Sequence, residues 1–248
     1  MEQDLRQKVA IVTGAGRGRG AAIAHALAAA GARVAVNDIN PDRAERVAAA
    51  LRKSGYEALG IDADIANKFQ CVHLIDTTRA KWGQLDILVN NAAVQPVDPI
   101  LKMDEWVWQR CLDVNLKGAF FMSQLVGRVM SDENSARGGV IINIGSPAGL
   151  DKAPAGHAAY AASKAGMLGF ARVCASEYAL FGVRVNTILP ADGDPVAGER
   201  QRAAGDPEGL AQVEPFGDLA EAVLFLCSPA AAHITGRTIP IEDGQAAL

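Results

Sequence analysis

Tyr160 and Lys164 are the residues of this sequence that could most readily transfer a proton together. They lie four positions apart in the run YAASK. Since four residues make about one helical turn, a helix would place both side chains on the same face. A phenol ordinarily titrates at about pH 10, and a neighbouring ammonium group stabilises its charged form. The pair could therefore protonate a carbonyl oxygen or accept the proton of an alcohol.

Ser146 and Asn115 extend this pair into a candidate catalytic set. Ser146 precedes Tyr160 by fourteen positions, and its hydroxyl could hold and polarise the same substrate oxygen. Each residue also has a structural interpretation: Tyr160 as a packed aromatic, Ser146 as a turn hydroxyl and Asn115 as a tie between helices. The combination of phenol, lysine and hydroxyl favours catalysis. His157, close before Tyr160, could contact substrate or lie in an exposed loop.

A glycine-rich turn follows the first apolar run and precedes an alanine-rich stretch. The turn, TGAGRGRG at residues 13–20, contains Gly14, Gly18 and Gly20 as candidates for close approach to a ligand. Glycines let backbone N–H groups approach a pyrophosphate, and the start of the following helix adds a partial positive charge. Glycine-rich turns also serve plain packing, but the apolar run before this turn and the helical stretch after it favour dinucleotide binding.

Asp38 is the residue that favours NAD over NADP. It ends the second apolar run, about twenty residues past the turn, where a carboxylate can accept hydrogen bonds from both hydroxyls of the adenosine ribose. The same charge would repel a 2′-phosphate. Arg17 and Arg19 favour the opposite choice, since either could reach a phosphate. We give Asp38 more weight because it acts directly on the group that distinguishes the two cofactors, and we expect NAD.

These residues need a framework that brings them together, and the alternation of apolar runs with helical stretches supplies one. Strands are expected at 9–13, 33–37, 57–62, 85–90, 139–144, 183–188 and 237–241. Helices are expected at 18–30, 41–53, 67–82, 104–130, 158–181 and 217–227, with Asn40 and Asp104 as caps. The pattern predicts one α/β domain over 1–248, a doubly wound, seven-stranded, mostly parallel sheet with helices on both faces.

Composition narrows the class of protein further. A net charge of −4 and a pI of about 5.6 argue against nucleic acid as a partner. The sequence has no apolar run of membrane-spanning length and no apolar leader, so we expect no membrane association and a cytoplasmic location. Four widely spaced cysteines favour neither a metal site nor a disulfide. The Gly-, Pro- and charge-rich stretch 190–216 is expected to be a substrate lid or a solvated connection.

With TGxxxGxG, NNA at 90–92, Asn115, Ser146 and YxxxK in this order, the chain resembles the classical short-chain dehydrogenase/reductase family over nearly its whole length. The resemblance implies a Rossmann fold and a nicotinamide cofactor. It also implies that Lys164 bonds the nicotinamide ribose, that Asn115 positions a water, and that Asp64 lies near the adenine. Further cofactor contacts implied in this way are Ile65, Asn90, Asn91, Ala92 and Pro190.

Two departures from the family pattern concern substrate and cofactor. Arg19 stands where the family usually has an aliphatic residue, and the usual Pro-Gly and Thr after the sixth strand are replaced by PADGDP at 190–195. In the family this threonine helps to hold the nicotinamide amide. In this chain we expect that contact to come from elsewhere or to be missing.

The leading hypothesis for function is an NAD(H)-dependent oxidoreductase that interconverts a secondary alcohol and a ketone. Alternatives are a 3-oxoacyl-(acyl-carrier-protein) or 3-oxoacyl-CoA reductase that uses NADPH, and a dinucleotide-binding interaction module with little turnover. The resemblance also implies a homo-oligomer, a dimer or tetramer, paired through the helices at 104–130 and 158–181.

Overall fold

A seven-stranded sheet with the order β3-β2-β1-β4-β5-β6-β7 forms the centre of the computed structural model, which describes residues 4–134, 137–151, 153–190 and 217–241. The strands are β1 Val9–Val12, β2 Arg33–Asp38, β3 Ala58–Asp62, β4 Ile87–Asn90, β5 Gly139–Ile144, β6 Val183–Leu189 and β7 Thr238–Pro240. Every pairing is parallel. The predicted doubly wound α/β fold is confirmed, and the sheet is parallel throughout rather than mostly so.

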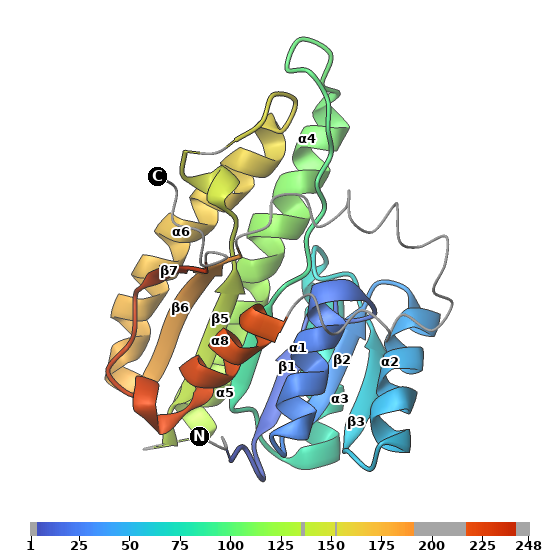
Figure 1. Cartoon of the computed structure of the whole chain (residues 1–248), viewed down its shortest axis with the longest axis vertical. Coiled ribbons are helices and arrows are strands. Elements are labelled where there is room, and N and C mark those ends of the chain that lie inside the picture. The colour runs from blue at the N-terminus through green and yellow to red at the C-terminus, as the bar shows by residue number, and fades with distance from the viewer. Residues whose placement is uncertain (1–3, 135–136, 152, 191–216, 242–248) are drawn as a thin grey trace.

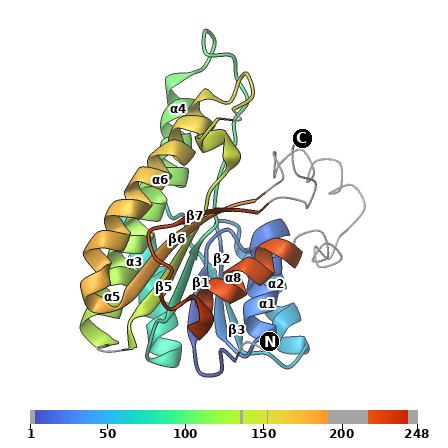
Figure 2. The ribbon, with the colours of Figure 1, turned by 60° about the vertical axis from the view of Figure 1, so that its left-hand side comes forward.

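Helices cover both faces of the sheet (Figures 1 and 2). They are α1 Gly18–Ala29, α2 Pro41–Lys53, α3 Lys68–Trp82, α4 Glu105–Leu112, α5 Ala119–Glu133, α6 Ala158–Tyr178 and α8 Gly217–Cys227. Residues of α1, α2 and α8 share one apolar core, and residues of α3, α5 and α6 share the other. Along β1, Val9 and Ile11 face the second core while Ala10 and Val12 face the first, which explains why the strand is apolar at every position.

Local signals set the helix boundaries. The Asn40 side chain accepts a hydrogen bond from the Arg43 N–H at 3.0 Å, and Asp104 accepts one from the Trp106 N–H at 2.8 Å, so both predicted caps are confirmed. The prediction of one continuous helix at 104–130 was wrong in one respect. A π-helical turn, η1 Asp113–Gly118, separates α4 from α5. Such a turn inserts extra backbone without changing the apolar pattern enough to be seen in a sequence.

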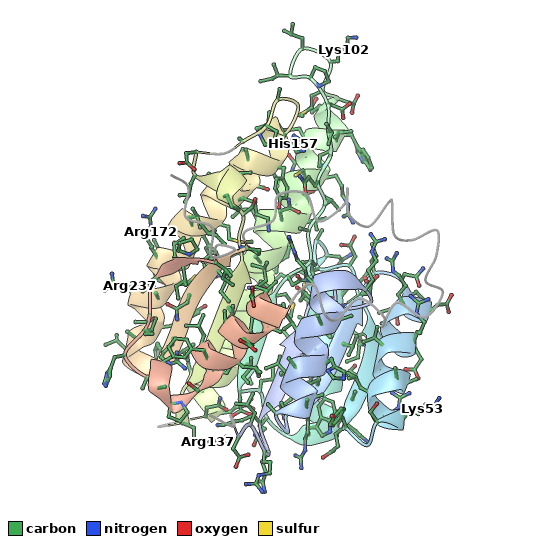
Figure 3. The ribbon with its side chains drawn as sticks, viewed as in Figure 1. Lys53, Lys102, Arg137, His157, Arg172 and Arg237 are labelled. Carbon is green, nitrogen blue, oxygen red and sulfur yellow. The ribbon has the colours of Figure 1, made fainter. Side chains whose placement is uncertain are left out.

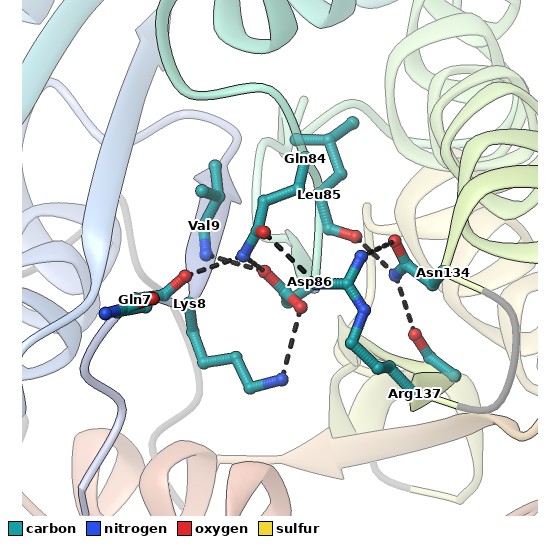
Figure 4. Close-up of polar contacts among 9 residues, drawn as sticks. Gln7, Lys8, Val9, Gln84, Leu85, Asp86, Asn134 and Arg137 are labelled. Carbon is teal, nitrogen blue, oxygen red and sulfur yellow. Dashed lines mark hydrogen bonds and ion pairs between the residues drawn. The ribbon is translucent and has the colours of Figure 1, made fainter.

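A polar network ties β1 to β4 at the amino ends of the strands (Figure 4). Asp86, only 3% exposed, accepts hydrogen bonds from the Val9 N–H at 2.9 Å and from Gln84 Nε2 at 2.7 Å, and it pairs with Lys8 Nζ at 3.2 Å. Asn134 donates to the Leu85 carbonyl beside it at 2.7 Å. This network fixes the strand pair whose opposite ends carry the glycine turn and the NNA motif.

The strand order reverses between β1 and β4, since β2 and β3 extend from one side of β1 and β4 to β7 extend from the other. In open parallel sheets, such a switch point leaves a crevice at the carboxyl ends of the strands, and ligands bind there. The expected lid at 190–216 lies outside the described residues, apart from Pro190 at the end of β6.

Candidate active site

A cavity lies at this switch point, and most of the predicted cofactor residues line it. Its lining includes Gly14, Arg17, Arg19 and Gly20 from the glycine turn, Asn37, Asp38, Ile39 and Arg43 after β2, Ala63, Asp64 and Ile65 after β3, Asn91 to Gln95 after β4, Arg110 and Val114, Ile144 and Gly145 after β5, and Tyr160 and Lys164 on α6. Of the described cofactor candidates, Gly18, Asn90 and Pro190 are outside this lining.

The glycine turn packs so tightly against the residues after β4 that no side chain would fit at Gly14. Gly14 has φ +62°, and a Cβ there would lie 2.7 Å from the Ala92 Cα. Asn91 Nδ2 donates to the Thr13 and Gly14 carbonyls at 2.9 and 3.1 Å, which fixes the turn on this strand. The turn leads directly into the amino end of α1, where backbone N–H groups and the helix dipole favour an anion. A dinucleotide pyrophosphate therefore fits this cradle.

Asp38 is the last residue of β2 and lines the cavity. It is 5% exposed, and its Oδ1 accepts hydrogen bonds from the Asn40 N–H at 2.9 Å and from Arg43 Nη2 at 2.6 Å. Gly16 lies directly against the carboxylate, since a Cβ at that position would be 2.6 Å from Oδ2. The sequence analysis missed Arg43, although the Asn40 cap could have indicated that the first turn of α2 lies beside Asp38.

Asp64 is held by an ion pair that sequence reasoning could not find. Arg110 Nη1 on α4 lies 2.9 Å from Asp64 Oδ2, and the two residues are 46 positions apart. Ile65 packs closely against Gly118, because a Cβ on that glycine would lie 2.8 Å from Ile65 Cδ1. These contacts position the loop after β3 against the region where α4 meets the π-helical turn.

Tyr160 and Lys164 come together on one face of α6. They are 3% and 2% exposed, and Lys164 Nζ lies 5.7 Å from the centroid of the Tyr160 ring. The ammonium donates a hydrogen bond to the Ile144 carbonyl at 2.7 Å, at the end of β5. Ser146 follows two residues later, is 8% exposed, and accepts a hydrogen bond from the Ala148 N–H at 3.2 Å. Ser146 is not among the residues that line the cavity, although Ile144 and Gly145 just before it are.

Burial of the Lys164 ammonium group lowers its pKa to about 8. The Cys111 thiol acts in the opposite direction, and the positive charge of Arg19 lowers the pKa further. Removing an ammonium from water disfavours its charged form, whereas a nearby anion restores that form. A pyrophosphate, a phenolate or an anionic substrate would each provide such an anion. The centre of the cavity is therefore electrostatically suited to negative charge.

Asn115 is fully buried in the π-helical turn η1, and its side-chain amide connects three parts of the site. Its Oδ1 accepts from the Val94 N–H at 2.8 Å, while its Nδ2 donates to the Val94 carbonyl and to Ser163 Oγ, each at 2.9 Å. Ser163 in turn donates to the Tyr160 carbonyl at 2.7 Å. The side chain thus ties the loop after β4 to the first turn of α6. The positioning of a water by Asn115 stays a prediction.

Three remaining candidates lie near the cavity or outside it. Asn90 is buried in β4, where it donates to Ser123 Oγ at 3.0 Å and Asn143 Oδ1 at 2.9 Å. His157 stands at the amino end of α6, with its Nδ1 3.2 Å from the Ala155 carbonyl (Figure 3), and is outside the described lining. Pro190 is buried at the end of β6. Within the described ranges, no cluster of three metal-ligating side chains and no helix of membrane-spanning character occurs.

Comparison with known proteins identifies the family. Residues 8–203 match the family described as short chain dehydrogenase. A 3-oxoacyl-(acyl-carrier-protein) reductase of Synechocystis sp. is 38% identical, over 97% of this chain and 98% of the relative. A D-threitol dehydrogenase of Mycolicibacterium smegmatis is 39% identical, over 96% and 92%. A solved structure of a putative short-chain alcohol dehydrogenase from Sinorhizobium meliloti 1021 superposes with a TM-score of 0.84 at 36% identity, covering 98% of each chain.

The chain therefore belongs to the short-chain dehydrogenase/reductase family. It is an oxidoreductase of that family, whose members bind NAD(P).

Replacing Lys164 with Met should change how stability depends on pH. The pKa of Lys164 is about 8 in the folded protein, against 10.5 for an unperturbed lysine, so between these values the folded state binds fewer protons than the unfolded chain. Wild-type protein should therefore gain stability relative to Lys164→Met as the pH rises from about 8 to about 10, by on the order of 2 to 3 kcal/mol.

Urea unfolding of both proteins across this pH range measures the difference. Lys53→Met, at the exposed end of α2 (Figure 3), is the matched control and should follow the wild-type pH dependence closely. Parallel pH curves for wild type and Lys164→Met would contradict the account of a buried, desolvated ammonium.

Proposed function

We propose that the chain is an NAD(H)-dependent oxidoreductase that interconverts a secondary alcohol and a ketone, with Tyr160 as the acid or base. The observation that carries this proposal is that Tyr160 and Lys164 line the same cavity as the glycine turn and Asp38. A dinucleotide bound from Asp38 across the turn would end beside Tyr160, so a substrate could meet the cofactor and the proton donor together.

The proton chemistry follows from the arrangement of the side chains. A bound nicotinamide dinucleotide would supply or accept the hydride. In reduction, the Tyr160 hydroxyl donates its proton to the carbonyl oxygen, and Lys164 stabilises the resulting phenolate. The Ser146 hydroxyl donates a hydrogen bond to the same oxygen as negative charge develops on it. In oxidation the proton passes from the alcohol to the Tyr160 phenolate.

NAD(H) is the proposed cofactor because a buried carboxylate stands where a 2′-phosphate would have to lie. Asp38 is 5% exposed and is held in place by Arg43, so it cannot turn away from the ribose at low cost. The second candidate is reduction of a 3-oxoacyl thioester with NADPH. The Synechocystis relative is named a 3-oxoacyl-(acyl-carrier-protein) reductase. Arg17 and Arg43 favour this second candidate, since both line the cavity and each could bind a phosphate.

We also propose that the chain forms homodimers or homotetramers through α5 and α6. Phe120 on α5 and Val173 on α6 are 38% and 57% exposed, although both are large apolar residues. Phe120 packs edge-on against Phe170 of α6 with the ring centroids 6.1 Å apart, so apolar side chains of the two helices meet at the surface. Association would bury this surface.

Replacing Tyr160 with Phe removes the proposed proton donor and should lower turnover by at least about 100-fold. Binding of NADH should change little, since the phenyl ring remains in place. The measurement is NADH oxidation and NAD reduction over a panel of ketones and secondary alcohols, with NADH binding followed by fluorescence. Tyr178→Phe, on the same helix with its hydroxyl donating to the Ser123 carbonyl at 3.1 Å, is the control and should keep its activity. Retention of most turnover by Tyr160→Phe would refute the assignment.

Replacing Asp38 with Ser should shift cofactor preference toward NADP. The substitution removes the charge that repels a 2′-phosphate and releases Arg43 to contact it. The ratio of kcat/KM for NADP to that for NAD should rise at least about tenfold, equivalent to about 1.4 kcal/mol. Asp42→Ser, an exposed change in the first turn of α2, should leave the ratio unchanged. If Asp38→Ser has the same selectivity as wild type, Asp38 does not select the cofactor.

A further inference from the structure

Arg19 is a cation in the lining of the cavity. It is partly buried and lines the cavity together with Tyr160 and Lys164. Its charge lowers the pKa of Lys164, so the guanidinium lies close enough to the ammonium to repel it. Arg17, two residues earlier, is exposed. The two arginines of the glycine turn therefore occupy different environments.

We propose that Arg19 binds a carboxylate of the substrate, so that the preferred substrates are hydroxy acids and oxo acids. The inference rests on the proposed function and specifies its substrate class. The carboxylate would lie between the start of α1 and the end of β5, beside the oxygen that Tyr160 protonates. Guanidinium binds carboxylate through two parallel hydrogen bonds, which would orient the substrate as well as attract it.

The charges of the cavity lining support an anionic ligand beyond the cofactor. Among the described lining residues, the carboxylates are Asp38 and Asp64, and each is bonded to an arginine, Arg43 at 2.6 Å and Arg110 at 2.9 Å. Arg17, Arg19 and Lys164 add positive charge to the same lining. A dinucleotide pyrophosphate brings one negative charge per phosphate, which leaves the described lining positive beside a bound cofactor.

The position of Arg19 separates this role from recognition of a 2′-phosphate. Asp38 ends β2, whereas Lys164 donates to the carbonyl of Ile144 at the end of β5. In the order β2-β1-β4-β5 these ends are three strand spacings apart, about 14 Å. The effect of Arg19 on Lys164 associates its guanidinium with the β5 end of the cavity, which favours a role there over recognition of a phosphate on the adenosine ribose.

A pyrophosphate contact is the nearest competing role for Arg19. The backbone N–H groups of the turn and of the first turn of α1 already provide donors for the pyrophosphate, and Arg17 lines the cavity beside them. An anion near Arg19 would instead offset the repulsion between Arg19 and Lys164. A substrate carboxylate would offset this repulsion only while the substrate is bound. The interaction would therefore favour substrates that carry a carboxylate.

Binding of unreactive acids to the enzyme saturated with NADH tests the proposal without requiring turnover. The probes are acetate, isobutyrate, cyclohexanecarboxylate and benzoate, each compared with its neutral amide by isothermal titration calorimetry. In wild type, at least one acid should bind at least about tenfold more tightly than its amide, and Arg19→Met should abolish that preference. Arg172→Met, at an exposed position of α6 outside the cavity lining, is the matched control and should retain it.

Two results would overturn the inference: wild type that binds no acid better than its amide, or Arg19→Met that retains the preference. A tenfold loss of NADH affinity in Arg19→Met with the acid preference intact would assign Arg19 to the pyrophosphate instead. Tyr160→Phe should bind the acids as wild type does. If acids bind through Arg19 but no hydride transfer occurs, the proposed function fails alone. If hydride transfer occurs without acid preference, only this inference fails.

Discussion

The buried ammonium of Lys164 is the group on which the site depends. It is 2% exposed, donates to the Ile144 carbonyl and lies beneath the Tyr160 ring. A cation in such a position is costly unless negative charge is supplied to it, as its lowered pKa reflects. In the proposed mechanism this negative charge comes from the Tyr160 phenolate and from a phosphate or a carboxylate bound in the cavity. Burial of the Lys164 ammonium lowers the stability of the folded protein, and the same ammonium stabilises the Tyr160 phenolate in the proposed reaction.

The sheet makes this arrangement possible because its strand order reverses between β1 and β4. The reversal opens a crevice in which the glycine turn, the end of β2 and the end of β5 all face one space. An extended dinucleotide can then reach from Asp38 to Lys164. The network around Asp86 holds β1 and β4 together at the amino ends of the strands, and the crevice lies at their carboxyl ends.

The features that the sequence predicted well are those encoded locally. Strand β1, covered on both faces, is apolar at each position, and Asn40 and Asp104 cap helices α2 and α4. The glycine turn and YAASK are short motifs with a direct physical meaning. Arg110 could not be assigned to Asp64, because their contact joins segments 46 positions apart. The π-helical turn at Asn115 was also missed, since one turn of wider helix barely alters the apolar periodicity. Arg19 lines the cavity with residues from segments far apart in the chain, so the sequence could identify the residue but not its neighbours.

A crystal structure of the enzyme with NAD and an unreactive carboxylate-bearing alcohol analogue tests the central claim most directly. The account predicts that the nicotinamide lies beside Ile144 and Gly145, with the Tyr160 hydroxyl within hydrogen-bond distance of the analogue's oxygen. A nicotinamide bound elsewhere, or an analogue oxygen out of reach of Tyr160, would contradict it.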